Sequence, residues 1–508
     1  MNSTADTLQS LVGSAVLIAI GTFLGNGLAL LAEILIARSL NPMLYGKISL
    51  AYTIISVLGS ILVFGTGEGI TRLSSSKDDM SDKLEIIRSG LFIVVVASIL
   101  GAIVTYQLRN FVSNVLSQPS LARIITYFIP YLLLYPISVF VLSLLRSFEK
   151  TTHMVLSRDF VSRITSIGVL FVMLNVGLSE AGPIIYWTSF PVFIIISVFI
   201  LNFSYIKFKF FTVPSKSNIK SLWSFSWPLA AGSIIFLALS RIDIIMIGYF
   251  LPAREVGIYR AIQPLQKAAT IVLSSFSFLF LPIATNHFED GEFNKLERIF
   301  RSVTKWSVLI TLPLIFVFTI SASSVVNLLF GTQYASAATP LAILSGGLFI
   351  RTIVGPNGDM VKAINMPRVE LYSSLLGLLS NIILNVLLIP EFGISGAAVA
   401  TVGGYTVYNI TELYIIYEST GITPISTSVI KPIVLGTFIV VVLSRIFITD
   451  NTLVNLCVIA LLAVISIMVA LITTNSVEEE DMVVINMVES RLGVELEKIK
   501  NILRMGVR

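Results

Sequence analysis

Three basic residues, Arg241, Lys267 and Arg351, lie inside long apolar segments of this chain, where a charge is costly. A charged side chain at the centre of a membrane span costs about 2.5–3.5 kcal/mol on insertion scales and is found mainly where it lines a polar cavity or pathway. An arginine guanidinium can bind phosphate oxygens through two parallel hydrogen bonds. We therefore expect these three side chains to contact an anionic headgroup, and a phosphate in particular.

Four carboxylates, Glu33, Glu68, Asp243 and Asp359, lie in similar apolar segments. A desolvated carboxylate can hold a proton, so these residues are candidates for coupling to H⁺ or Na⁺. The alternative is that the acids and the cations only neutralise one another between helices. Arg241 and Asp243 would point about 200° apart on a continuous helix, so at most one of them would face a cavity.

Polar and aromatic residues at helical spacing suggest a water-filled cavity near these charges. They combine hydrogen-bonding groups with aromatic surface, and several recur at i, i+3 or i+4. The alternative is that such residues make ordinary contacts between membrane helices. The side chains expected to line the cavity are Asn26, Gln263, Gln266, Asn381, Asn385, Tyr405 and Tyr408.

The composition of the chain is that of a polytopic membrane protein. Of its 508 residues, 55% are hydrophobic and 12% are charged, with a mean hydropathy of +0.90, whereas a soluble protein carries about 25% charged residues. The single cysteine, Cys457, excludes a disulfide framework and a cysteine zinc site. With two histidines, no metal centre and no other cofactor is expected. The net charge of +5 is more typical of cytoplasmic loops than of nucleic-acid binding.

About fourteen apolar segments of membrane-spanning length predict an all-α fold. The stretch ARSLNPMLYGKISLA (37–51) recurs as IGYFLPAREVGIYRA (247–261), with Gly46 opposite Gly257. A parallel repeat of this kind predicts two six-helix lobes around a central cavity, followed by two C-terminal helices. The expected parts are an N-terminus (1–10), an N-lobe (11–204), a linker (205–221), a C-lobe (222–417), helices 13 and 14 (430–473) and an amphipathic tail (474–508).

Lysine and arginine are concentrated in alternate loops and in the tail, for example at Arg146, Arg158 and Arg163. The positive-inside rule places such loops in the cytoplasm. We therefore expect both termini to be cytoplasmic and the protein to lie in the plasma membrane of a prokaryote.

Two stretches carry a resemblance to a known family: ARSLNPMLYGKISLAYTIISVLGSILVFGTGEGITR and SRIDIIMIGYFLPAREVGIYRAI. Together with the helix count and the duplication, they make residues 11–475 similar to the polysaccharide transporters, or Wzx-like O-antigen flippases. That family belongs to the MOP superfamily, with the MATE drug exporters and the lipid II flippases. The resemblance implies translocation of a polyprenyl-diphosphate-linked oligosaccharide from the cytoplasmic to the outer leaflet by alternating access. It also implies this lipid-linked glycan, the bilayer and other glycan-assembly enzymes as partners.

Two other functions are compatible with a polytopic membrane protein. An ion-coupled, MATE-like exporter of organic cations would need an acidic, aromatic cavity without several competing cations. A membrane-bound polysaccharide polymerase or glycosyltransferase would need a catalytic carboxylate cluster, yet the longest expected outer loops, 109–122 and 322–338, contain no acidic residue. No phosphate-binding glycine loop with its lysine is present in the sequence either. We therefore expect a transporter rather than an enzyme.

Overall fold

The structure is a computed structural model that describes residues 2–75, 79–202, 214–447 and 451–478, together with 481, 482 and 489. The elements formed by these residues are all helices, which confirms the all-α prediction. Most of the expected linker (205–221) and most of the expected tail (474–508) lie outside the described residues. The expected outer loops 109–122 and 322–338 are largely helical, because α4 (Met80–Val115) runs further than predicted and α14 (Ala322–Phe330) forms within the second.

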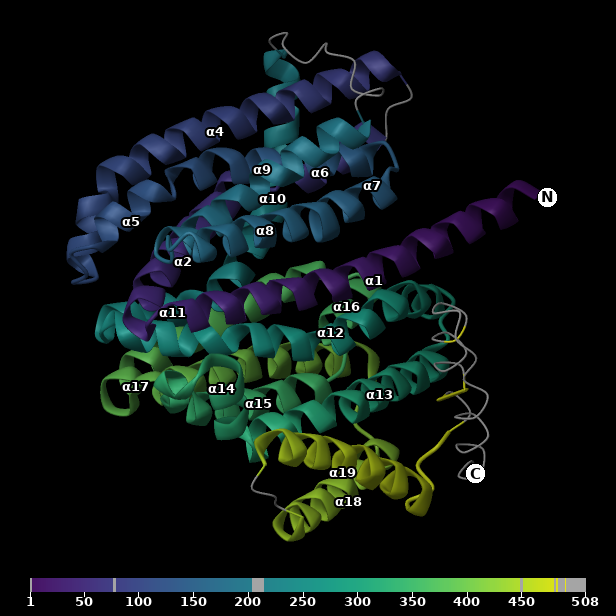
Figure 1. The fold of residues 1–508 in the computed structure, drawn as a ribbon. Coiled ribbons are helices and arrows are strands. Elements are labelled where there is room, and N and C mark those ends of the chain that lie inside the picture. Colours follow the sequence, from purple (N-terminus) through teal and green to yellow (C-terminus); the bar gives the residue numbers. More distant parts are fainter. Residues whose placement is uncertain are drawn as a thin grey trace. The chain divides into compact units, whose positions relative to one another are not determined.

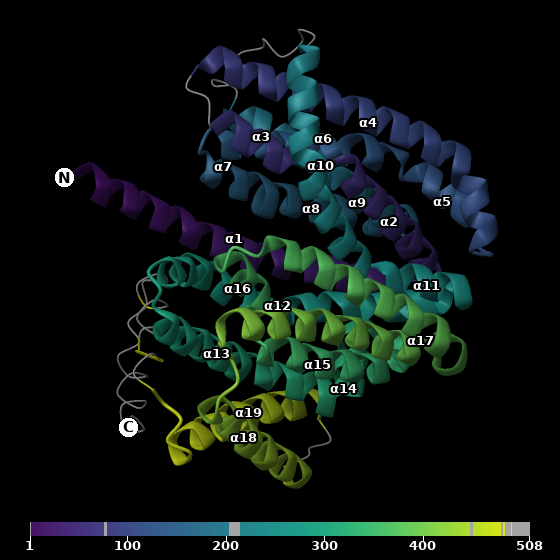
Figure 2. The ribbon, with the colours of Figure 1, turned by 180° about the vertical axis from the view of Figure 1, so that it is seen from behind.

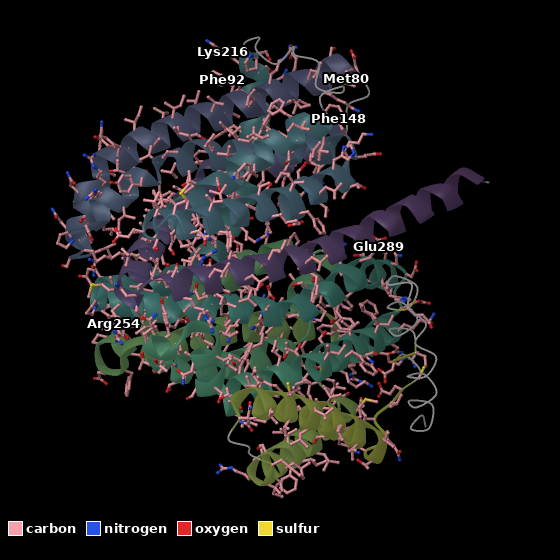
Figure 3. The ribbon with its side chains drawn as sticks, viewed as in Figure 1. Met80, Phe92, Phe148, Lys216, Arg254 and Glu289 are labelled. Atoms are coloured by element: carbon pink, nitrogen blue, oxygen red, sulfur yellow. The ribbon has the colours of Figure 1, made fainter. Side chains whose placement is uncertain are left out.

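The helices are those of a multi-pass membrane protein. In the described part of the chain, 10 helices are long and apolar enough to cross a membrane, or up to 11 if the bent α10 (Lys216–Leu239) is counted as one span. The expected count of about fourteen is not confirmed. Large apolar side chains are exposed along these helices, such as Phe92 at 44% on α4 (Figure 3). Apolar surface of this extent is suited to contact with lipid chains.

The chain divides into two compact units, residues 1–264 and 265–508. In the first unit α10 packs against α2, α3 and α4, and α11 packs against α2; Figure 2 shows α10 running steeply across α4. The division therefore falls inside α12 and not at the expected linker. The helices of unit 1 are α1 (Asn2–Ser39), α2 (Pro42–Leu62), α3 (Thr66–Ser75), α4, α5 (Leu121–Tyr127), α6 (Ile129–Ser147), α7 (Thr151–Val155), the π-helix η1 (Leu156–Val161), α8 (Ser162–Asn175), α9 (Ala181–Asn202), α10, α11 (Ile242–Phe250) and the start of α12 (Ala253–Glu289).

The second unit is built on α13, which contacts α15, α18 and α19. Figure 1 shows α18 and α19 lying side by side, and these two helices are also in contact. Helix α17 (Pro367–Thr420) has two arms that meet at a turn at Gly393 (φ 58°, ψ −138°). The helices of unit 2 after α12 are α13 (Phe293–Ile320), α14, the 3₁₀ turn η2 (Thr332–Ala337), α15 (Ala338–Ile353), α16 (Asn357–Ala363), α17 (Pro367–Thr420), α18 (Thr427–Ile446) and α19 (Thr452–Thr473).

The glycines of the repeated stretches, Gly46 on α2 and Gly257 on α12, face each other within unit 1. A Cβ atom on Gly46 would overlap the carbonyl oxygen of Ala253, and a Cβ atom on Gly257 would overlap that of Pro42. Small residues allow membrane helices to approach this closely. The alignment of the two glycines in the sequence therefore corresponds to a direct contact between backbones.

Replacing Gly46 with alanine is expected to destabilise the protein by about 3 kcal/mol, because the added methyl group overpacks a backbone contact. Thermal unfolding of the purified protein in detergent would measure the loss. The matched control is Gly168→Ala on α8, where a Cβ atom would have no neighbour within 4 Å. That variant should be neutral or slightly more stable, since alanine favours helix. Equal stability of the two variants would contradict the close contact.

Candidate functional site

Unit 1 contains a cavity of about 590 Å³ whose lining includes five charged side chains. It lies among α1, α2, α3, α6, η1, α8, α9 and α10. Its polar and charged lining residues are Thr22, Asn26, Ser60, Glu68, Ser138, Ser143, Arg146, Arg158, Asp159, Arg163 and Ser233. The cavity is large enough to hold a phosphorylated headgroup with part of a sugar chain, since ligand pockets typically span about 300–1,000 Å³.

A break between α2 and α3 places Glu68 in this cavity. The helix stops after Leu62, and Phe64 (φ 48°) and Gly65 (φ 65°) adopt left-handed conformations before α3 begins at Thr66. Glycine is needed at position 65, because a Cβ atom there would lie 2.6 Å from the backbone oxygen of Ser226. The break puts Glu68 in the first turn of α3, where exposed N–H groups favour a negative charge.

The π-helical segment η1 carries the other charges. Arg158 and Asp159 lie within it and Arg163 follows in the first turns of α8. π-Bulges are rare and are frequently found at functional sites. Helix α1 packs against this segment, and its Gly25 makes the approach possible, because a Cβ atom there would lie 3.0 Å from Cβ of Asp159 and 3.2 Å from Nε of Arg163.

The charges in the cavity are not all neutralised by one another. Asp159 is 2% exposed and accepts hydrogen bonds from Arg158 at 2.7–3.1 Å. Arg163 has a buried Nε with no hydrogen-bond partner among the described residues, and its guanidinium lies 5.4 Å from the ring centroid of Phe190. Arg146 makes a 3.3 Å contact from Nε to Sδ of Met154. Three guanidinium groups against two carboxylates give a cavity suited to an anion.

The structure places the predicted site residues of unit 1 in several different settings. Asn26 and Glu68 line the cavity. Glu33 instead forms a buried ion pair with Arg260. Asp243 is 3% exposed and accepts a hydrogen bond from Gln263 Nε2 at 3.3 Å.

Arg241 lies at the break between α10 and α11. Its backbone has φ −132° and ψ −15°, so the helical angle expected between Arg241 and Asp243 does not apply. Its Nη1 is buried without a hydrogen-bond partner among the described residues. The broken helix thus leaves Arg241 half-buried, with one guanidinium nitrogen unpaired among the described residues.

Five of the residues predicted for the C-lobe belong to unit 2: Gln266, Lys267, Arg351, Asp359 and Tyr405. The guanidinium of Arg351 lies 5.5 Å from the ring centroid of Tyr405, so these two are brought together. Lys267 is exposed, and the neighbouring Gln266 lies 3.5 Å from Ser345 Oγ. Asp359 lies 3.9 Å from Nζ of Lys362 on the same short helix, α16.

The three remaining predicted residues of unit 2 are buried in helix packing. Asn385 donates to Asn381 at 2.8 Å, and both side chains are fully buried where Gly404 of the opposite α17 arm approaches. Tyr408 is 8% exposed, next to the fully buried Glu412 on the following turn. These positions were expected to line an open cavity, and the structure shows closely packed contacts at the two asparagines.

Sequence reasoning missed the three arginines of the cavity. It treated Arg146, Arg158 and Arg163 as topology-setting cations and placed all intramembrane cations in the second half of the chain. All three lie instead on helices and line the cavity. The available signal was the SRDFVSR motif (157–163), which places a carboxylate between two arginines at the start of an apolar segment.

A family model described as polysaccharide biosynthesis protein matches residues 11–285, more than half of the chain and all of unit 1 except its first residues. The chain belongs to this family. Membership confirms the predicted relationship to polysaccharide transporters, and the matched region includes every residue that lines the cavity.

One curated relative of this chain is the uncharacterized membrane protein MJ1068 of Methanocaldococcus jannaschii. The two are 29% identical over 204 residues, which cover 39% of this chain and 40% of the relative. The probable low-salt glycan biosynthesis flippase Agl15 of Haloferax volcanii is 26% identical over 201 residues, 40% of this chain and 43% of the relative. The chain therefore spans less than half the length of the curated relatives it matches.

Two solved structures show the same fold as this chain. The lipid II flippase MurJ in an inward closed conformation superposes with a TM-score of 0.75 at 17% identity, covering 89% of this chain and 97% of MurJ. An inward-facing MATE multidrug transporter gives a TM-score of 0.66 at 13% identity, covering 80% of this chain and 98% of that one. The chain therefore shares its fold with these two transporters.

Proposed function

We propose that the protein is a flippase that translocates a polyprenyl-diphosphate-linked oligosaccharide from the cytoplasmic to the outer leaflet by alternating access. The observation that carries this proposal is the cavity of unit 1, with Arg146, Arg158 and Arg163 in its lining. Family membership and the naming of Agl15 as a probable glycan biosynthesis flippase support the same activity. The proposed location is the plasma membrane of a prokaryote, with both termini cytoplasmic and other glycan-assembly enzymes as partners.

In this mechanism the diphosphate enters the cavity and exchanges its hydration shell for guanidinium groups. Uncompensated charge is very costly in a low-dielectric region, and a charge-assisted hydrogen bond contributes about 1.5–3 kcal/mol. Arg163 is the strongest candidate, because its buried Nε is left without a partner among the described residues. The polyprenyl chain stays in the surrounding lipid while the headgroup crosses.

The charged residues outside the cavity have proposed roles in other steps. Arg241 of unit 1 and Lys267 and Arg351 of unit 2 would contact the diphosphate at other points of its passage. Glu68 is the foremost candidate for H⁺ or Na⁺ coupling, since it lies in the same cavity as the arginines. An anionic substrate bound to the arginines would change the affinity of the Glu68 carboxylate for H⁺ or Na⁺, which couples the two binding events.

The alternative is a MATE-like exporter of organic cations, which the shared fold supports. The charge of the cavity argues against it. Asp159 is already paired with Arg158, so an organic cation would meet two further guanidinium groups and only Glu68 to balance them. Like charges in a cavity of low dielectric repel strongly.

The test is mass spectrometry of lipid extracts from cells that lack the protein, complemented with wild type or with Arg163→Ala. Loss of the protein should cause a polyprenyl-diphosphate oligosaccharide to accumulate, and wild type should relieve this. Loss of one charge-assisted hydrogen bond should slow flipping about tenfold to a hundredfold, so Arg163→Ala should leave the lipid accumulated.

The matched control is Arg254→Ala, which removes an exposed cation, 50% accessible, from the same unit (Figure 3). It should restore flipping fully, and both variants should reach the membrane in equal amounts. Full relief of the accumulation by Arg163→Ala would refute the proposed site. An unchanged lipid pool in the deletion strain, together with efflux of cationic dyes, would favour the exporter.

A further inference from the structure

Unit 1 has a second cavity, of about 580 Å³, among the first turns of α2, α5 and α9. Its lining divides into two chemical classes. The polar and charged members are Lys47, Ser120, Arg123, Tyr127 and Glu180. The aliphatic members are Leu44, Ile48, Ile124, Ala181, Ile184 and Ile185. A cavity with a charged part and an aliphatic part is suited to an amphipathic ligand.

This second cavity lies at one end of the membrane spans. Lys47 is in the first turns of the span that begins at Pro42, and Glu180 directly precedes the span that begins at Ala181. Ser60, which lines the larger cavity, is about 20 Å further along α2 at a rise of 1.5 Å per residue. The second cavity is therefore at the depth of lipid headgroups, where aromatic residues such as Tyr127 are typically found.

The cations of this second cavity are available to a ligand. Lys47 is half-buried and no carboxylate of the described residues pairs with it. Arg123 donates from Nε to the hydroxyl of Tyr127 at 2.8 Å, which raises the pKa of the guanidinium and leaves its other N–H groups free of that bond. Glu180 forms no ion pair within 4 Å with either cation. Two cations and one acid leave the cavity with a net positive charge.

We propose that this second cavity binds an anionic phospholipid, with Lys47 and Arg123 on the headgroup phosphate and one acyl chain along the aliphatic lining. A guanidinium or ammonium group binds a headgroup phosphate through charge-assisted hydrogen bonds. The few polar groups of the lining offer little to a sugar chain, which distinguishes this site from the polar cavity deeper in unit 1. The site does not depend on the proposed flippase activity.

The test is native mass spectrometry of the purified full-length protein, with phosphatidylglycerol or phosphatidylcholine added at equal concentrations. Wild type should retain phosphatidylglycerol in preference. Lys47→Ala and Arg123→Ala should each weaken its retention about tenfold, the effect of one lost charge-assisted hydrogen bond. Glu180→Gln should strengthen retention, because it removes a negative charge from beside the phosphate. Arg254→Ala is the control and should change nothing.

Three outcomes would overturn the assignment. Equal retention of the two lipids by wild type would show that the cations do not select a negative headgroup. Displacement of phosphatidylglycerol by inorganic phosphate would show an anion site without a lipid component. Stronger retention of undecaprenyl diphosphate, lost in the same variants, would assign the cavity to the proposed flippase substrate instead.

Discussion

Replacement of Glu33 by alanine is expected to destabilise the protein by about 3–5 kcal/mol, the usual loss when one partner of a buried ion pair is removed. Oε1 of Glu33 accepts from Arg260 Nη2 at 2.6 Å, and Oε2 accepts from the hydroxyl of Tyr45 at 2.9 Å. The Arg260 side chain is 3% exposed. Without Glu33 its charge would remain buried and uncompensated, so the thermal unfolding temperature in detergent should fall sharply.

A double variant separates the ion pair from the packing. Glu33→Met with Arg260→Met removes both charges and keeps similar volumes, so its stability should return close to that of wild type. This result would assign Glu33 to the structure of unit 1 rather than to ion coupling. If Glu33→Gln were as stable as wild type and yet lost transport only under an imposed ion gradient, the coupling hypothesis would be favoured.

Asp481→Ala is the second large change, with an expected loss of about 3–5 kcal/mol for the same reason. The carboxylate and its partner Lys305 are both fully buried in unit 2. Asp481 also accepts from Ser302 Oγ at 2.6 Å, from Trp306 Nε1 at 2.9 Å and from the backbone N–H of Glu478 at 2.8 Å. This network attaches the segment after α19 to α13, so its loss should release that segment.

Trp306 offers a direct reading of this release. In Asp481→Ala, the lost hydrogen bond to Asp481 should shift the fluorescence emission of Trp306, and the unfolding temperature should fall. If the emission shift is absent when Trp306 is replaced by phenylalanine, the signal comes from Trp306. The control is Glu478→Ala, because Glu478 is 40% exposed and lies 3.8 Å from Lys305. Exposed pairs contribute up to about 1 kcal/mol, so this variant should change stability little. A comparable loss in both variants would show that Asp481 has no special role.

Part of the fold was predictable because hydropathy and glycine spacing are local properties of the chain. Apolar segments of about 20 residues specify membrane helices whatever they pack against. The repeated glycines Gly46 and Gly257 pointed to equivalent positions, and the structure shows that they touch. Helix number was less predictable, since Gly65 and Gly393 introduce a break and a turn that depend on neighbouring helices.

The candidate site was predicted less well, for a physical reason. A cation near the end of an apolar segment can extend to the membrane surface or turn into a cavity, and its sequence neighbours do not decide which. Sequence position predicts Arg146 and Arg163 to be loop cations, whereas both line the cavity of unit 1. It predicts Asn381 and Asn385 to line a cavity, whereas both are fully buried. In each case the deciding neighbour comes from another helix.

By itself, the sequence determined that this protein is an all-α, multi-pass membrane protein. Those properties are sums over many residues, so no single misplaced side chain alters them. Only the tertiary structure decided that Glu33 meets Arg260, 227 positions along the chain. It also decided that a π-helical segment turns Arg158 and Arg163 into one cavity. Such pairings depend on which helix faces come together, and a local pattern does not contain that information.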